Sequence, residues 1–424
     1  MRPSLTELFR VFARIGLLSF GGPAAQISLM HTELVQRRSW LEEKQFLGAL
    51  SFCMLLPGPE AMQLATYAGW RLRGVPGGLI AGLLFVLPGA LVITALALGY
   101  ASYGQVPLVQ AAFAGIKAAV IMIVLQALLS LSRRALSGWD DWLLAGAAFV
   151  AMFFLAVPFP LVIAIAALWG ALRAVRTTSD RTAPAAPHAP SQALAPVPLV
   201  QTLVTVAIWG TLWALPVVLV WAMDARFLTD LALFFSKLAV VTFGGAYAVL
   251  AYMTQAVVET HGWLTTQQMI DALGLAETTP GPLILVTQFV GLLAGHAESG
   301  PALALLAGAL TLWVTFTPCF LWIFAGAPYV EALLARPRLK GALAGISAAV
   351  VGVILNLSVW FALHVLFGDV SRGPLGPLPV PASFLPINAG LTCLAAILLL
   401  GLRLPMIAVL ALMAGVAGGL QIMP

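Results

Sequence analysis

The stretch Phe20-Gly21-Gly22 recurs as Phe243-Gly244-Gly245, and Pro57-Gly58-Pro59 recurs as Pro280-Gly281-Pro282. Both copies are displaced by one constant interval, the repeat offset, and further identities such as Trp40 with Trp263 hold it between them. Chance similarity between apolar segments could match leucines and alanines, but it would not keep glycine pairs, Pro-Gly-Pro triplets and tryptophans in register. The chain therefore contains one unit twice. Repeated halves whose apolar segments are broken by glycine and proline are typical of secondary transporters.

The composition is that of a membrane protein. Hydrophobic residues make up 61% of the chain and charged residues 9%, whereas a soluble domain has roughly 25% charged residues. At about 20 residues per crossing, several charge-free windows are long enough to span a bilayer. These windows are 143–172, 238–258, 299–330, 341–368, 373–402 and 404–424. We expect an all-α, multi-pass integral membrane protein with roughly ten to thirteen membrane segments, some of them broken or re-entrant.

The two copies are separated by a linker and an additional apolar segment. We assign residues 1–172 to a first membrane repeat and residues 231–424 to a second. Residues 173–198 are rich in proline and alanine, which predicts an extended or disordered cytoplasmic connector. Residues 199–223 are long enough for one transmembrane helix. A single crossing there would deliver the second repeat to the membrane upside down.

The placement of basic residues supports this inversion. In the first half they flank loops reached by even numbers of crossings, if 140–172 is a two-span hairpin turning at Val157-Pro158. The residues are Arg71, Arg73, Arg133, Arg134, Arg173, Arg176 and Arg181. Basic loops face the cytoplasm. In the second half the loop 296–299 has no lysine or arginine, while the loop equivalent to the uncharged 103–107 carries Arg336, Arg338 and Lys340. The pattern predicts two inverted-topology repeats.

The interruptions are where we expect a binding site. Gly21-Gly22 followed by Pro23 predicts that one helix stops and another starts. Pro57-Gly58-Pro59 lies inside the apolar stretch 46–70, which has basic residues at both ends, so it predicts the tip of a re-entrant hairpin. With the second copies at Gly244-Gly245 and Pro280-Gly281-Pro282, helix N-termini would meet near the midplane and bind an anion. The alternative is helix packing through small residues or a simple kink.

Basic residues within apolar sequence strengthen the anion hypothesis. Arg14 and Lys237 align at the repeat offset, each six residues before its Phe-Gly-Gly. A cation inside a span is costly and indicates function, so we predict that both bind substrate. The alternative is that both lie near a helix end and snorkel to lipid headgroups. Lys117 is a third candidate, although its counterpart is Ser347.

Acidic candidates lie beside the Pro-Gly-Pro triplets. Glu60 follows the first triplet and Glu277 precedes the second by three residues, and we predict that they couple protons to transport. For Glu60 the alternative is a carboxylate that only stabilises a helix start. Asp271 and Glu259 are expected on a loop or interface surface.

Neighbouring polar side chains could donate hydrogen bonds to an oxyanion, Gln63 foremost. The others are Gln26, Thr278, Thr279, Thr287 and Gln288. Each of them could instead join transmembrane helices to one another.

Signatures of other classes are missing from the sequence. Cys53, Cys319 and Cys393 have neither metal spacing nor a disulfide pattern. The five histidines form no metal or catalytic motif, and no nucleotide-binding glycine loop is present. No basic cluster with interleaved aromatics suggests nucleic acid. We therefore expect no metal, no cofactor, no nucleic-acid partner and no ATP-driven pump.

At these residues the chain resembles the chromate ion transporter family in its long two-domain form. The resemblance rests on the Phe-Gly-Gly-Pro at 20–23, Trp40-Leu41, the Leu56-Pro-Gly-Pro at 56–59 with Gln63, Tyr67 and Gly69 behind it, and the second copies. It implies a carrier of the bacterial inner membrane that expels chromate, confers resistance, is driven by the proton gradient and is related to sulfate handling. The second copy departs from the pattern, because Ala246 replaces the proline and no glutamate follows Pro282.

Three functional hypotheses remain at this stage. The first is an exporter of oxyanion dianions, chromate first. The second is an importer or exchanger of sulfate or another anion on the same scaffold. The third is a membrane-embedded enzyme or assembly scaffold. The partners expected are chromate, sulfate and the lipid bilayer, and a homodimer is left open.

Overall fold

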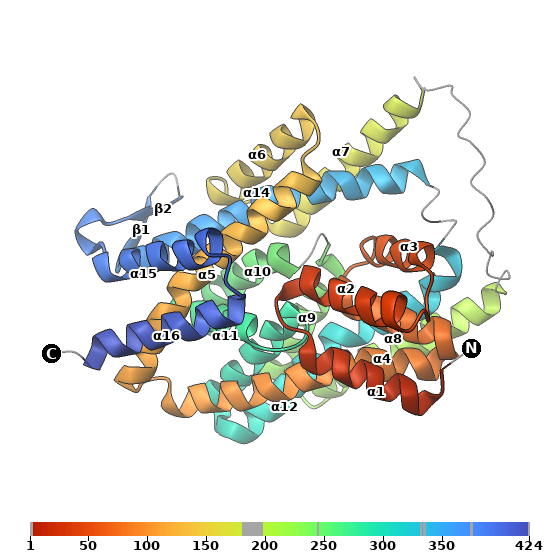
Figure 1. Ribbon diagram of the computed structural model, residues 1–424, viewed down its shortest axis with the longest axis horizontal. Coiled ribbons are helices and arrows are strands. Elements are labelled where there is room, and N and C mark those ends of the chain that lie inside the picture. Colours follow the sequence, from red (N-terminus) through yellow and green to blue (C-terminus); the bar gives the residue numbers. More distant parts are fainter. Residues whose placement is uncertain are drawn as a thin grey trace.

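The chain folds into helices that repeat in order, with one small β-hairpin near the C-terminus (Figure 1). The computed structural model describes residues 3–179, 198–243, 246–330, 333, 336–373 and 376–422. The all-helical expectation is thus met apart from the antiparallel strands β1 (Val370–Gly373) and β2 (Gly376–Pro379). Strand β2 lies at the start of the charge-free window 373–402, and the helix after the hairpin begins only at Pro386. The apolar helical part of this window is therefore Pro386–Gly401, and a membrane crossing there stays a prediction.

The first half begins with two broken segments and continues with longer helices. Its elements are α1 (Leu5–Leu18), α2 (Gly22–His31), a π-turn η1 (Thr32–Arg37), α3 (Glu43–Cys53), α4 (Glu60–Tyr103), α5 (Pro107–Ala135), α6 (Trp139–Phe153) and α7 (Phe159–Ser179). The predicted stop at Gly21-Gly22 is present, since the backbone of both glycines is left-handed between α1 and α2. The predicted turn between residues 140 and 172 is also present, between α6 and α7.

The second half follows the same order after a connecting helix α8 (Leu199–Ala222). Its elements are α9 (Arg226–Val241), α10 (Ala246–Gln255), a π-turn η2 (Ala256–Thr260), α11 (Thr266–Thr278), η3 (Leu283–Leu285), α12 (Val286–Gly326), η4 (Ala327–Tyr329), α14 (Pro337–Leu366), β1, β2, η5 (Pro381–Ser383), α15 (Pro386–Ala396), η6 (Ile397–Gly401) and α16 (Met406–Ile422). Even the π-turn after the second helix of each half is repeated.

Matched residues of the two halves perform the same local tasks. Gln45 accepts a hydrogen bond from the N–H of Glu42 (3.2 Å), and Gln268 accepts one from the N–H of Thr265 (2.9 Å). Both pairs form the capping box that starts α3 and α11. The identity of these two glutamines at the repeat offset therefore reflects helix capping.

The long helices α4 and α12 are each bent at a glycine that only this residue type accommodates easily. Gly74 has φ 64° and ψ −157°, and Gly300 has φ 77° and ψ −167°. Side-chain-bearing residues rarely adopt this conformation. The two bends occupy equivalent places in the halves once the additional turn η3, which follows the second Pro-Gly-Pro, is allowed for. Each long helix is therefore two straight segments.

Helices from opposite halves pack against each other in a reciprocal way. In Figure 1, α5 lies against α15 and α16, and α14 lies against α6 and α7. A Cβ on Gly115 would lie 2.0 Å from the carbonyl oxygen of Met413 on α16, and one on Gly345 would lie 2.3 Å from that of Ala166 on α7. These two matched glycines allow the backbones to approach closely, so each half completes the other.

Within the described residues, five helices are long and apolar enough to cross a membrane. They are Glu60–Tyr103, Pro107–Ala135, Leu199–Ala222, Leu283–Tyr329 and Pro337–Leu366, and shorter apolar helices cover Phe159–Val175, Pro386–Gly401 and Met406–Ile422. This is the architecture of an integral membrane protein. Helix α8 buries none of its side chains and packs on α9 and α12. The number of crossings stays a prediction, as does the assignment of the repeats to residues 1–172 and 231–424.

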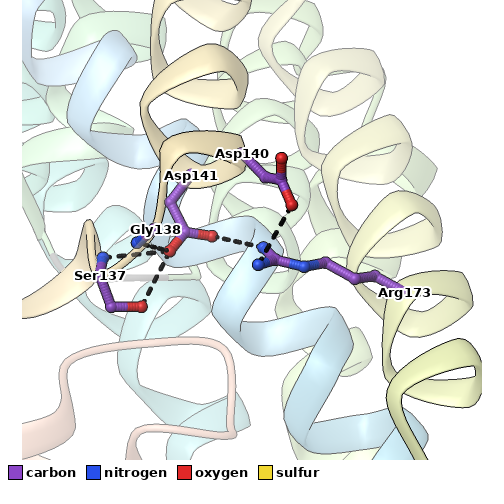
Figure 2. A network of polar contacts seen from close by, with 5 residues as sticks. All are labelled: Ser137, Gly138, Asp140, Asp141 and Arg173. Carbon is purple, nitrogen blue, oxygen red and sulfur yellow. Dashed lines mark hydrogen bonds and ion pairs between the residues drawn. The ribbon is translucent and has the colours of Figure 1, made fainter. Parts of the chain in front are cut away.

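A polar network at the base of the α6–α7 hairpin holds its two helices together (Figure 2). The Oδ2 atom of Asp141 accepts hydrogen bonds of 3.0 Å from the N–H and hydroxyl of Ser137 and from the N–H of Gly138. Its Oδ1 atom accepts one of 2.9 Å from Arg173, which also pairs with Asp140 at 3.2 Å. Burial alone would raise the pKa of Asp141, but these hydrogen bonds lower it. Helix α7 continues to Ser179, beyond the predicted start of the linker at 173, and residues 180–197 lie outside the described residues.

Candidate functional site

The broken segments of the two halves meet through two equivalent hydrogen bonds. The N–H of Gly58 donates to the carbonyl oxygen of Thr242, and the N–H of Gly281 donates to that of Ser19, each at 2.8 Å. The two donors match each other at the repeat offset, and so do the two acceptors. We call these four residues the crossing. Each Pro-Gly-Pro tip therefore ends against the helix break of the other half.

Glycine is required at the tips of the crossing. Gly58 has φ 116° and Gly281 has φ 90°, a region that side-chain-bearing residues avoid. The acceptor residues Ser19 and Thr242 are 0% and 2% exposed, so water does not satisfy their carbonyl oxygens. A buried carbonyl without a partner costs about 1–3 kcal/mol. The crossing is thus fixed by backbone groups that have to pair.

Two of the predicted hydrogen-bond donors, Gln26 and Gln63, bond to backbone carbonyl oxygens at or beside the crossing. Gln26, which is 1% exposed, donates to the carbonyl oxygens of Gly281 at 2.7 Å and Ser19 at 3.2 Å. Gln63 donates to the carbonyl oxygen of Pro57 at 2.7 Å, and its Oε1 atom has no hydrogen-bond partner within the described part of the chain. Gln288 bonds to α4 through Thr94 at 3.0 Å.

The hydroxyls of the predicted threonines bond to their own backbone segments. The residues are Thr278, Thr279 and Thr287. Substrate binding by Gln63 stays a prediction.

A cavity of about 880 Å³ opens beside the crossing. We call it the first cavity. The start of α2 lines it with Gly21, Gly22, Pro23 and Ala24, the start of α4 with Glu60, and the start of α10 with Tyr247. Its other walls come from the C-terminal part of α5 and from the segment joining η6 to α16. Residues of both halves therefore line a single chamber.

The first cavity is suited to an anion. Neither Gly21 before α2 nor Pro59 before α4 provides a side-chain hydrogen bond to the helix start. Free N–H groups and the positive end of the helix dipole attract negative charge. Arg133, Arg134 and Arg403 also line the cavity, and guanidinium groups bind oxyanions through charge-assisted hydrogen bonds.

Sequence reasoning assigned Arg133 and Arg134 only to loop sidedness, and it overlooked Arg403. Nothing local distinguishes them from other loop arginines. A contact between α5 and α16 brings them into one cavity.

The two predicted proton-coupling carboxylates flank this cavity. Glu60 is half-buried and lines it directly. Glu277 is 5% exposed, and its Oε1 atom accepts a hydrogen bond of 2.9 Å from the hydroxyl of Tyr247, which lines the cavity. Glu277 is therefore one side chain away from the chamber. Proton coupling stays a prediction for both.

The predicted cations Arg14 and Lys237 lie elsewhere. Both side chains are exposed, and neither lines the first cavity. The Nζ atom of Lys237 is 5.9 Å from the ring centroid of Tyr252. Their exposure is the geometry that the snorkelling alternative describes, and anion binding by them stays a prediction.

Arg14 has an acidic neighbour in Glu33, which lies in η1. Burial alone would raise the pKa of Glu33, but its hydrogen bond to Arg38 and the charges of Arg38, Arg37 and Arg14 lower it. Arg14 therefore belongs to a basic group around this carboxylate.

Lys117 forms an ion pair across the two halves. Its Nζ atom lies 3.0 Å from Oδ1 of Asp271 on α11, and the hydroxyl of Tyr100 donates to Oδ2 of Asp271 at 2.7 Å. Asp271 is 4% exposed. Its expected position on a loop or interface surface was therefore wrong, because Lys117 neutralises it inside the protein.

Gly244 and Gly245 lie outside the described residues.

A model of the chromate transporter family matches residues 6–171 and 229–419 of the chain. The "Probable chromate transport protein" of Synechococcus elongatus is 31% identical over 419 residues, which cover 97% of this chain and 95% of that protein. The "Chromate transport protein" of Pseudomonas aeruginosa is 35% identical, with 83% and 79% covered. That of Cupriavidus metallidurans is 29% identical, with 85% and 83% covered. No solved structure matches the chain.

Proposed function

The chain belongs to the chromate transporter family, and we propose that it is a secondary active transporter that exports chromate across the bacterial inner membrane and so confers chromate resistance. It is a transporter and not an enzyme. The observation that carries the proposal is the first cavity, where two helix starts and three arginines from both halves surround one chamber. Chromate is a tetrahedral dianion, and such a chamber suits its charge.

The orientation that we propose follows from the same arginines. Arg133 and Arg134 come from the first half and Arg403 from the second, yet all three line one cavity. By the positive-inside rule this cavity opens to the cytoplasm. Both halves give the same sidedness only if the second is inverted, which supports the inverted-topology repeats. The first cavity is then where the anion is captured from the cell.

The driving force that we propose combines the membrane potential with protons. A dianion leaving a negative interior gains about 2.3 kcal/mol per charge per 100 mV. Glu60 and Glu277 flank the chamber and would exchange or carry a proton with the anion. Glu60→Gln should then flatten the pH dependence of transport, and an unchanged profile would leave Glu60 as a helix-start carboxylate.

The test is labelled chromate uptake into inverted membrane vesicles with and without an imposed proton gradient. Arg134→Gln should raise the KM for chromate about five-fold, as expected for one charge acting on a dianion roughly 8 Å away in water. Arg71→Gln is the matched control, because Arg71 is expected on the same face and does not line the cavity. Wild-type vesicles that move no chromate would refute the proposal. Uptake of sulfate in preference to chromate would favour the sulfate importer or exchanger.

A further inference from the structure

The structure contains a second cavity of about 440 Å³, lined by the C-terminal part of α14, by α10 and η2, by the end of α6 and by the β-hairpin. Four lining residues of α14 match four lining residues of α5 in the first cavity when the two helices are aligned at Gly115 and Gly345. The pairs are Gln126 with Asn356, Ala127 with Leu357, Ser130 with Trp360 and Arg134 with His364. The two cavities therefore occupy equivalent places in the two halves.

The connecting loops support this equivalence. Ala156, between α6 and α7, lines the second cavity with φ 51°, and Arg403, between η6 and α16, lines the first with φ 52°. The next residue in each loop makes the same hydrogen bond. The N–H of Val157 donates to the carbonyl oxygen of Ala151 at 2.9 Å, and the N–H of Leu404 donates to that of Leu398 at 3.0 Å, six residues back in both cases. Both loops thus share one backbone conformation, with Ala156 and Arg403 at the same place in it.

The equivalent cavities differ in charge. Where the first has Arg134 and Arg403, the second has His364 and Ala156. The Nδ1 atom of His364 lies 2.8 Å from the carbonyl oxygen of Trp360. The acidic residue Glu259 also lines the second cavity. At these two equivalent places the first chamber offers a dianion two guanidinium groups, and the second offers none.

The cavities also differ in how close they come to the crossing. The first reaches the starts of α2 and α4, whereas the second contacts α10 only from Ala251, a full turn beyond the start of that helix at Ala246. The first chamber therefore includes Gly21 and Glu60, each two residues from a residue of the crossing, whereas the second includes no residue that close to it.

We propose that the second cavity is the release vestibule for the same tetrahedral oxyanion on the opposite face, and that the replacement of its two equivalent arginines by His364 and Ala156 makes release favourable. This inference rests on the proposed function. The shared backbone fold of the two halves forms two equivalent chambers, and the side chains at equivalent positions give these chambers unequal affinity for the anion.

The test measures the KM for chromate entry separately through each face, in inverted and in right-side-out vesicles. Ala156→Arg and His364→Arg each restore the arginine that the other half has at that place. One added charge near a dianion, roughly 8 Å away in water, corresponds to about a five-fold change in affinity. We expect the KM in right-side-out vesicles to fall about five-fold for each variant, with the KM in inverted vesicles unchanged.

The controls separate this inference from folding defects and from the proposed function. Ala297→Arg adds the same charge at an exposed position on the same expected face without lining the cavity, so both KM values should stay as in the wild type. The converse variant Arg403→Ala should raise the KM in inverted vesicles only. Ala156 and His364 lie on different elements. If one of the two arginine variants fails to fold, the other still tests the proposal.

Two results would overturn the release vestibule while wild-type transport is intact. One is an unchanged KM in right-side-out vesicles for correctly inserted Ala156→Arg and His364→Arg. The other is a fall of the KM in inverted vesicles instead, which would place the second cavity on the cytoplasmic face. Wild-type protein that moves no chromate through either face would refute the proposed function itself.

Discussion

Removing the ammonium group of Lys117 should destabilise the protein far more than removing it together with its partner charge. The Lys117 and Asp271 side chains are 12% and 5% exposed, and their charged atoms are 3.0 Å apart. At an effective dielectric constant of about 20, the attraction at this separation is roughly 5–6 kcal/mol. Desolvation costs several kcal/mol per ion, so the net contribution of the pair to stability is small.

The single variant Lys117→Met leaves the carboxylate of Asp271 buried without its counter-charge. Such a loss typically costs about 3–5 kcal/mol. In the double variant Lys117→Met with Asp271→Asn, no charge remains, and the amide oxygen still accepts the hydrogen bond from Tyr100 that the structure shows. The double variant should therefore be close to the wild type in stability.

The assay is thermal unfolding of the purified protein in detergent, followed by tryptophan fluorescence, together with chromate flux in vesicles. We expect a clear fall in Tm for Lys117→Met, recovery in the double variant, and flux that recovers with it. A single variant that unfolds at the wild-type temperature would refute the buried pair. A double variant that is stable but moves no chromate would instead support the predicted role of Lys117 in binding substrate.

Three further predictions address the crossing, the α6–α7 base and the exposed cations. Gly58→Ala should lower the free energy of unfolding by roughly 1–3 kcal/mol, because the backbone there is left-handed. It should also lower chromate flux, since a Cβ at this position would lie 3.0 Å from a cysteine sulfur. Gly48→Ala is the control: a Cβ there has open space, so Tm and flux should stay as in the wild type. Because the pKa of Asp141 is lowered in the folded protein, its contribution to stability is present above pH about 4 and is lost as the pH falls below that. Asp141→Asn should remove this part of the pH dependence of Tm, and an unchanged acid profile would contradict it. Arg14→Gln and Lys237→Gln should leave chromate flux within about two-fold of the wild type, because exposed charges contribute little; a strong loss of flux would restore their predicted role in anion binding.

The sequence was most informative where a residue's task is local. A left-handed glycine, a proline at a helix start or a capping glutamine acts within a few residues of the chain. The break at Gly21-Gly22 and the tip at Pro57-Gly58-Pro59 could therefore be located from the sequence, as could the turn between α6 and α7. Comparing the two copies added the prediction that the tips converge.

Features that depend on long-range contacts could not be predicted in the same way. Asp271 looks like a surface carboxylate until α5 places Lys117 beside it. Arg403 looks like any loop arginine until α16 packs on α5. Strand β2 lies in the charge-free window 373–402, where composition alone does not distinguish a strand from part of a span. For Asp271 and Arg403 the deciding partner is distant in sequence.

The two halves share their backbone constraints and differ in the side chains that face the cavities. Gly58 and Gly281 pair with buried carbonyl oxygens from a left-handed backbone conformation that favours glycine, so a side chain at either position is penalised. A residue such as Arg403, exposed in a cavity, is less constrained by packing, and its equivalent is Ala156. Tyr247 and Glu277 likewise form a hydrogen-bonded pair where the first half has Ala24 and Met54. A duplicated frame with equal chambers would bind an anion equally from both faces, and a carrier with equal affinity on both faces gains no directional preference from its binding sites. Divergence confined to cavity side chains changes that balance at little cost in stability. We therefore expect these few side chains to determine the unequal affinities of the two faces, and the glycines and prolines that both halves share to determine the ability to alternate between faces.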